Sequence, residues 1–468
     1  MTKLHRRHFL KSAAAVSAAS FTSTIGSFAA RAADTTGYKA LVCVFLKGGM
    51  DCHDTVLPYD QSSYDSYTNL RQQLMGIYNA LPAGQNRARS QLLPLSPTNS
   101  GDFGGRQFAL PPEMAGLHDL FARGKASIVG NVGPLITPID RTAYREDRSL
   151  RPDKLFSHND QQATWMSLSA EGQGLGWGGR FADAALLANA NANPVFTAIS
   201  VAGNEVFLSG QEAVQFQIDS GGTDTIRELE NDYLLRGAQR SVVAETILED
   251  HFRGTGFSGG NFFERDIAAI SSRAIDSNKL FNDTLESIGD FVTPFPESGL
   301  GRQLSTVAKT IGARNSLGAA RQVFFVSMGG FDTHSTQAQK LPGLQAQIND
   351  AVAAFYAATE ELGIENDVTL FTASDFGRTL IINGDGSDHG WGAHHFVVGG
   401  AVNGGQIYGD VPPMEVDHSQ DAGRGRLIPT TSIEQFAAPL GRWFGLNESE
   451  LSTALPNLSA FTGSPTFV

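Results

Sequence analysis

The chain has 468 residues, of which 41% are hydrophobic, and its 35 basic and 48 acidic side chains give a formal net charge of −13 at pH 7. This acidic balance disfavours nucleic acid and anionic membrane surfaces as main partners. Two cysteines, Cys43 and Cys52, are too few for a disulfide framework or a cysteine-based zinc cage.

Residues 1–33 have the features of a twin-arginine export signal. An Arg-Arg pair (residues 6–7) precedes a run rich in Ala and Ser, and small residues surround positions 30–33. The run is too short to span a membrane, and no later stretch is apolar for about 18 residues without interruption. We therefore expect a periplasmic or secreted protein, exported by the twin-arginine translocase. Without the five basic residues of the signal, 30 basic and 48 acidic side chains remain, a net charge of −18.

Six short apolar runs rich in β-branched residues are predicted as strands that are buried on both faces. They are residues 40–46, 126–133, 195–201, 322–328, 368–374 and 395–400. Helical patterns lie between them, at residues 111–125, 343–363 and 430–446. In the last of these, Thr431 and Glu434 predict a capping box, and Pro439 predicts a bend or a break.

Alternating strands and helices predict an α/β fold with a large, mostly parallel sheet and helices on both faces. We expect residues 34–468 to form one domain. Residues 205–310 are polar and favour helix, and we interpret them as a helical insertion or cap. In sheets of this kind ligands bind at the carboxyl ends of the strands.

Two stretches that follow predicted strands are nearly alike: "LKGGMDCHD" (residues 46–54) and "SMGGFDTHS" (residues 327–335). In an extended segment Asp332 and His334 point to the same side, so that they can offer an oxygen and a nitrogen to one metal ion. Taken alone, an Asp-x-His sequence in a loop more often consists of polar side chains exposed to solvent. Asp51, or its neighbour Asp54, would be the contribution of the first strand.

A third glycine-rich region, "GSDHGWGAHHFVVGG" (residues 386–400), makes the metal hypothesis stronger. Five of the nine histidines beyond the signal lie in the three regions, which is not what scattered core or surface histidines would give. The predicted metal ligands are Asp51, Asp332, His334, Asp375, His389 and His394, with His395 as an alternative to the last two. Mixed Asp/His ligation fits one or two Zn²⁺, Mn²⁺ or Fe²⁺ ions better than Ca²⁺ or Mg²⁺.

Two further residues are candidates for catalysis. Ser157 precedes a predicted helix, whose N-terminus would favour an alkoxide or a bound anion. The alternative is that Ser157 is an ordinary helix cap. Arg378 could hold an oxyanion with two donors, and its alternative is an ion pair with an acidic neighbour.

The chain resembles the bacterial family called domain of unknown function 1501, which belongs with the alkaline phosphatase and sulfatase superfamily. The resemblance rests on the twin-arginine signal and on "VFLKGGMDCHDTVLPY", "FSHNDQQATW", "GGFDTHSTQ", "ASDFGRTLIINGDGSDHGWGAHHFVVGGAVNGGQIYG" and "GRLIPTTSIEQFAAPLGRWFGL". It implies an alkaline phosphatase-like fold with a one- or two-metal hydrolytic site at the strand ends. Family members usually have Glu-Phe-Gly-Arg-Thr where this chain has Asp375, and His53 is not a usual family residue.

The roles that the resemblance implies agree with those inferred above from the residues alone. Asp332 and His334 would bind one metal, Asp375 the second, and Ser157 would lie in the region of the nucleophile. We therefore expect an exported metal-dependent hydrolase that acts on phosphate or sulfate esters of a small molecule or glycan. The alternative is a non-catalytic exported protein that keeps the fold and a metal but serves in binding or assembly at the cell envelope.

Overall fold

A computed structural model describes residues 33–169, 172, 174–223, 242–254 and 261–468. Ala33–Val468 form one compact unit. The predicted export signal lies outside the described residues. Among the described helices, none is both long enough and apolar enough to cross a membrane.

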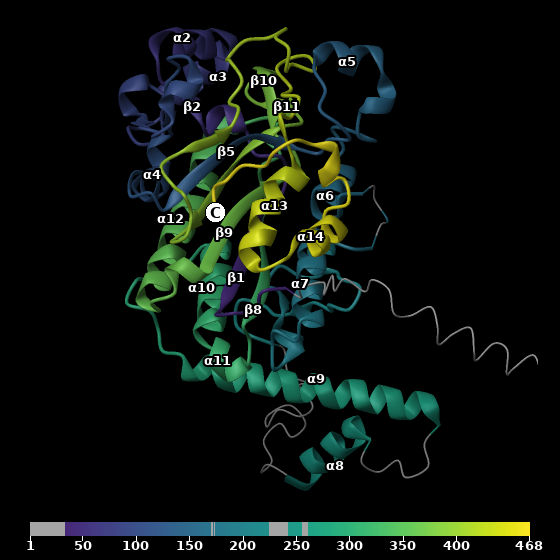
Figure 1. Cartoon of the computed structure of the whole chain (residues 1–468). Helices are drawn as coiled ribbons and strands as arrows, with labels where there is room; N and C mark the ends of the chain where they lie inside the picture. Colours follow the sequence, from purple (N-terminus) through teal and green to yellow (C-terminus); the bar gives the residue numbers. More distant parts are fainter. Residues whose placement is uncertain (1–32, 170–171, 173, 224–241, 255–260) are drawn as a thin grey trace, which may run out of the picture. The chain divides into compact units, whose positions relative to one another are not determined.

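The centre of the fold is a nine-stranded sheet in the order β13-β5-β12-β9-β1-β8-β6-β7, with β14 also paired to β5 (Figure 1). Its strands are β1 (Lys39–Leu46), β5 (Ala126–Gly133), β6 (Ala198–Ser200), β7 (Phe216–Gln217), β8 (Arg321–Met328), β9 (Val368–Ser374), β12 (Ala393–Gly399), β13 (Ile407–Gly409) and β14 (Thr431–Ser432). All neighbouring pairs are parallel except those of β12, which runs antiparallel to β5 and β9. The predicted mostly parallel sheet is confirmed, and all six predicted strands belong to it.

Helices cover both faces of the sheet, and β1 shows why its apolar run is continuous. Val42, Val44 and Leu46 join one buried cluster with α4 (Ala115–Ala122), α10 (Gly299–Gly312) and α12 (Gln337–Glu361). Cys43 and Phe45 join a second cluster with α6 (His158–Ser167), α7 (Trp177–Leu187) and α13 (Ile433–Phe444). Figure 1 shows α10 and α12 on one side of the sheet and α6 and α13 on the other. Alternate residues of one strand thus fill two cores.

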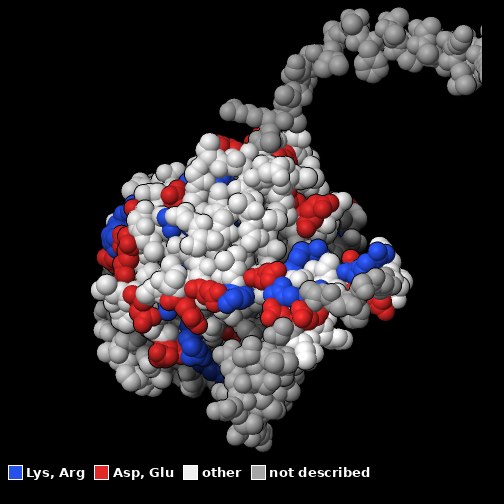
Figure 2. All heavy atoms as spheres, turned by 90° about the horizontal axis from the view of Figure 1, so that it is seen from below, with Lys and Arg blue, Asp and Glu red and all other residues white. Residues whose placement is uncertain are grey.

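The remaining elements surround this sheet. The further helices are α2 (Gln61–Leu70), α3 (Gln72–Asn79), α5 (Arg141–Glu146), α8 (Val242–Arg253), α9 (Phe262–Ser287), α11 (Arg314–Leu317) and α14 (Glu448–Ala454). Two small sheets are formed by β2 (Leu57–Pro58), β3 (Leu93–Pro94) and β4 (Phe108–Leu110), and by β10 (Arg378–Ile382) and β11 (Ser387–His389). Figure 2 shows acidic and basic side chains mixed on the face seen from below.

Two local predictions differ from the structure. The capping box of α13 is formed by Ser432 and Gln435, one residue after the predicted Thr431 and Glu434. Of the bend or break predicted at Pro439, the break does not occur, because α13 continues through Pro439 as one helix. The region 205–310 contains α8 and α9, but it also contributes β7 to the central sheet and most of α10 to the core.

We expect acid to destabilise the fold through the buried histidines of β12. Burial lowers the pKa of His395 to about 3, whereas the unfolded chain takes up a proton near pH 6.5. Stability is therefore lost as the pH falls below about 6.5, and this one histidine would remove about 2 kcal/mol by pH 5. Urea unfolding at pH 7 and pH 5 measures the loss. His395→Phe should reduce it, and an unchanged loss would contradict the assignment.

Candidate metal centre

Three histidine side chains and Asp332 converge at the carboxyl edge of the sheet. The Nε2 atoms of His334 and His389 lie 3.1 Å and 3.3 Å from Asp332 Oδ1. His158 Nε2 lies 3.6 Å from Asp332 Oδ2, and the Nε2 atoms of His334 and His389 are 2.8 Å apart. His158, Asp332 and His389 each place one possible ligand atom within 4.8 Å of the others.

The other nitrogen of each ring faces an oxygen acceptor. His158 Nδ1 lies 2.6 Å from Asp375 Oδ2, and His389 Nδ1 lies 2.7 Å from the carbonyl oxygen of Phe156. His334 Nδ1 lies 3.4 Å from Asp388 Oδ1. A proton held at Nδ1 leaves the Nε2 lone pair free, which is how metal-binding histidines are usually oriented.

This arrangement favours a proton or a cation between the rings. His389 must donate from Nδ1 because a carbonyl can only accept, so its neutral ring turns a lone pair toward His334 and Asp332. Nε2 of His158 is buried without a hydrogen-bond partner among the described residues. The hydrogen bond to Asp375 raises the pKa of His158, so a proton can serve here, and a divalent cation serves all three rings at once.

The donor set fits a transition metal. Ligand atoms about 2.0–2.1 Å from a tetrahedral metal are separated by about 3.3 Å. The contact between His334 and His389 and those of the three histidines with Asp332 run from 2.8 to 3.6 Å. Three imidazoles with one carboxylate suit Zn²⁺, Mn²⁺ or Fe²⁺ rather than Ca²⁺ or Mg²⁺. The side chains of Asp332 and His334 are each 44% exposed, so the site opens to solvent.

Glycines make the close approach of the two motifs possible. Gly48 has φ +117°, and a Cβ there would lie 2.4 Å from the backbone nitrogen of Asp332. The first motif therefore passes directly against the second only because position 48 has no side chain.

Asp375 and Arg378 support the site from behind it. Asp375 was predicted as a ligand, but its carboxylate meets His158 at Nδ1, on the edge of the ring away from the other ligand atoms. It also accepts hydrogen bonds from Gly48 N and Gln162 Nε2. It therefore orients His158 from the position directly after β9.

Arg378 is fully buried. Its guanidinium is hydrogen-bonded to other groups of the protein. It donates to Asp332 Oδ1 at 3.0 Å, to the Gly48 carbonyl at 2.9 Å and to both oxygens of Ser387. The predicted oxyanion clamp is therefore replaced by the alternative, an ion pair. Burial raises the pKa of Asp332, but Arg378 and the neighbouring histidines together lower it, so this carboxylate is held ionised.

Ser157 lies at the site without facing it through a hydrogen bond. It is the N-cap residue of α6, directly before His158, and its hydroxyl donates to Asp160 Oδ2 at 2.7 Å. The two residues at 154 and 156 have φ values of 50° and 72°, which are uncommon for residues other than glycine. This strained segment presents the Phe156 carbonyl to His389.

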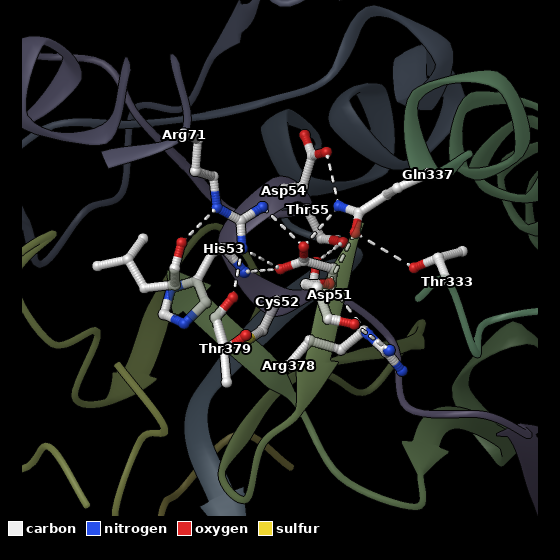
Figure 3. A network of polar contacts seen from close by, with 12 residues as sticks. Asp51, Cys52, His53, Asp54, Thr55, Arg71, Thr333, Gln337, Arg378 and Thr379 are labelled. Carbon is white, nitrogen blue, oxygen red and sulfur yellow. Dashed lines mark hydrogen bonds and ion pairs between the residues drawn. The ribbon is translucent and has the colours of Figure 1, made fainter. Parts of the chain in front are cut away.

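Asp51 and His394 were predicted as metal ligands, and the structure places both elsewhere. Arg71 donates to both oxygens of Asp51 at 2.7 and 3.1 Å, and Gln337 donates to Oδ2 at 2.7 Å (Figure 3). Burial raises the pKa of Asp51, but Arg71 outweighs burial and lowers it. His394 is buried in β12, where its Nδ1 accepts from Asn131 N at 2.9 Å.

Asp54, the alternative to Asp51, is also used by the structure. It pairs with buried Arg87 at 2.7 Å and accepts hydrogen bonds from Tyr67 and Tyr78. The two aspartates of the first motif therefore form buried ion pairs that hold the segment in place (Figure 3 shows that of Asp51). His53 donates toward the Gly425 carbonyl, 3.2 Å away.

Sequence reasoning missed His158. Its signal was present, because "FSHND" combines a helix cap with a histidine at the first helical position. In the sequence analysis only the serine of this segment is given a role.

The comparison with known families covers nearly the whole chain. Residues 38–454 match the family described as "Protein of unknown function (DUF1501)". The chain belongs to this family. The resemblance that the motifs indicated is therefore confirmed at the level of the family.

Other comparisons add little about DUF1501 chemistry. No curated protein matches the chain. The solved structures that it resembles include Ps i-CgsB in complex with k-i-k-neocarrahexaose, at 9% identity over 88% of this chain and 74% of that chain, with a TM-score of 0.34. A second structure of Ps i-CgsB matches at 8% identity over 90% and 76%, with a TM-score of 0.32. At these scores neither likeness bears on the activity of this protein.

The centre predicts a graded loss of metal affinity. His389→Ala removes a ligand and should abolish stoichiometric Zn²⁺ binding, whereas Asp375→Asn removes only the anchor of His158 and should weaken binding by about 10–100-fold. Isothermal titration of chelator-treated protein measures both. His118→Ala, at a half-buried histidine on α4 that contacts the carbonyl oxygen of Pro94, is the control. Equal affinity in all three variants would contradict the assignment.

Substitutions that break the buried ion pairs of the first motif should lower the stability of the fold rather than its affinity for metal. Arg71→Ala leaves Asp51 charged and unpaired in the core, which should cost about 3–5 kcal/mol of unfolding free energy. Chemical denaturation measures it. Arg442→Ala, which breaks the exposed pair with Glu448, should cost at most about 1 kcal/mol. Similar costs for the two variants would show that Asp51 does not depend on Arg71.

Proposed function

We propose that this DUF1501 protein is an exported metal-dependent hydrolase of phosphate or sulfate esters, with an alkaline phosphatase-like fold. The observation that carries the proposal is the convergence of three imidazole Nε2 atoms on Asp332, each ring anchored through Nδ1. The large sheet, with its site at the carboxyl edge, supports it. The twin-arginine pattern of residues 6–7 supports export.

The protein's own residues would bind and orient. A bound divalent metal would supply a positive charge that attracts an ester anion and stabilises the charge developing on it. Arg378 keeps Asp332 ionised and fixed, and Asp375 and Phe156 fix two of the rings. Ser157 would have to release Asp160 before its hydroxyl could act as a nucleophile.

A second candidate function is metal binding without catalysis, in an exported binding or envelope-assembly protein. One observation favours it: His334 lies 2.8 Å from His389 and 3.1 Å from Asp332, so it could add a fourth ligand to the group of His158, Asp332 and His389. Four protein ligands fill a tetrahedral shell, as structural zinc sites do, whereas catalytic sites keep one position open.

A panel of phosphate and sulfate esters, assayed on purified protein of known metal content, separates the two functions. We expect metal-dependent turnover that Asp332→Ala lowers by more than about 100-fold, since it removes the ligand on which the three rings converge. Asp102→Ala, at an exposed aspartate, is the matched control.

Stoichiometric metal with no turnover on any ester would favour the second candidate, and protein that binds no metal would overturn both. Ser157→Ala then tests the nucleophile. It should keep the metal, and it should lose turnover only if the serine hydroxyl attacks the ester.

A further inference from the structure

One face of helix α9 is buried in the C-terminal half of the helix and exposed in the N-terminal half. In the C-terminal half, Phe281 is fully buried and Leu285 packs against the core. Phe281 lies 18 residues after Phe263, which is five full turns of an α-helix, so the two side chains project in the same direction. The N-terminal half continues this face where no part of the described core covers it.

The uncovered part of this face is apolar. Phe263, Ile267, Ile270 and Ala274 follow one another at spacings of four, three and four residues, which is the pattern of a helix–helix seam. The three large side chains are 74%, 64% and 53% exposed, and Ala274 is exposed as well. We call these four residues the α9 seam. Soluble proteins rarely leave such a row uncovered.

The charges beside the α9 seam indicate which partner fits. Asp266 and Arg273 both flank the same edge of the seam, both are exposed, and neither forms an ion pair with another described residue. They lie seven residues apart and have opposite charge. A copy of this helix running in the opposite direction would bring the Asp266 of each copy beside the Arg273 of the other.

We infer that the α9 seam pairs antiparallel with the α9 seam of a second copy of this chain. With the two-fold axis between residues 268 and 269, Ile267 faces the partner's Ile270 and Phe263 faces the partner's Ala274. Two pairs of large isoleucine side chains then meet at the centre of the interface, and at each end a large phenylalanine meets a small alanine. The interface is isologous, as in most homodimers.

A lipid surface fits the α9 seam less well. Helices that bind anionic membranes are rich in Lys and Arg on their polar face. Helix α9 carries five acidic and three basic side chains. Figure 2 shows acidic and basic side chains mixed on the face seen from below.

Sedimentation of the full-length mature protein over a range of concentrations tests the inference. We expect a dimer for the unaltered protein. Arg273→Glu places like charges at both sites and should raise the dimer dissociation constant by at least about tenfold, and Asp266→Arg should do the same. Arg265→Glu, which makes the same charge change on the opposite face of α9, is the matched control and should leave the constant unchanged.

Restoration makes the test specific to this geometry. The double variant Asp266→Arg with Arg273→Glu exchanges the two charges and should dimerise again, and an equal mixture of the two single variants should form a heterodimer. A monomer at all concentrations would overturn the inference. So would a dimer that resists both single variants, a double variant that stays monomeric, or binding to uncharged lipid vesicles by a protein that does not dimerise.

Discussion

The position of the segment after β1 depends on two buried ion pairs, Asp51 with Arg71 and Asp54 with Arg87. Each carboxylate is withdrawn from water, so each needs a guanidinium and further donors to remain in the core. Arg71 also donates to the Thr379 and Leu380 carbonyls of β10, which joins the helical region before α3 to the strand that begins with Arg378. The first motif thereby fixes the frame in which the second motif works.

The two glycine-rich motifs divide their tasks between support and chemistry. Gly48 of the first allows the backbone before Asp332 to pass against it, and its carbonyl accepts from Arg378. Arg378 in turn binds Asp332, on which the three histidine rings converge. A chain of direct contacts therefore runs from the end of β1 to the candidate metal ligands, although only the second motif supplies any of them.

Sequence reasoning was reliable where a pattern repeats along one segment. The apolar runs of the central strands had to be buried on both faces, and they are. It failed where a side chain's role is decided by a distant partner. Nothing next to Asp51 in the sequence announces Arg71, and nothing next to Asp375 announces the ring of His158. The histidines near residue 394 misled in part, because His389 reaches the candidate centre whereas His394 and His395 are buried within β12.

The orientation of His389 does not depend on the side chain of its hydrogen-bond partner. Its anchor is the carbonyl oxygen of Phe156, a group that every amino acid carries. No substitution of residue 156 can delete that oxygen, although one that cannot tolerate a φ of 72° could move it. His158, held by the carboxylate of Asp375, has no such protection. A single substitution of Asp375 removes the hydrogen bond that orients His158. The hydrogen bond that orients His389 persists as long as the backbone keeps its course. Substitutions that accumulate within the family should therefore disturb the two rings at different rates.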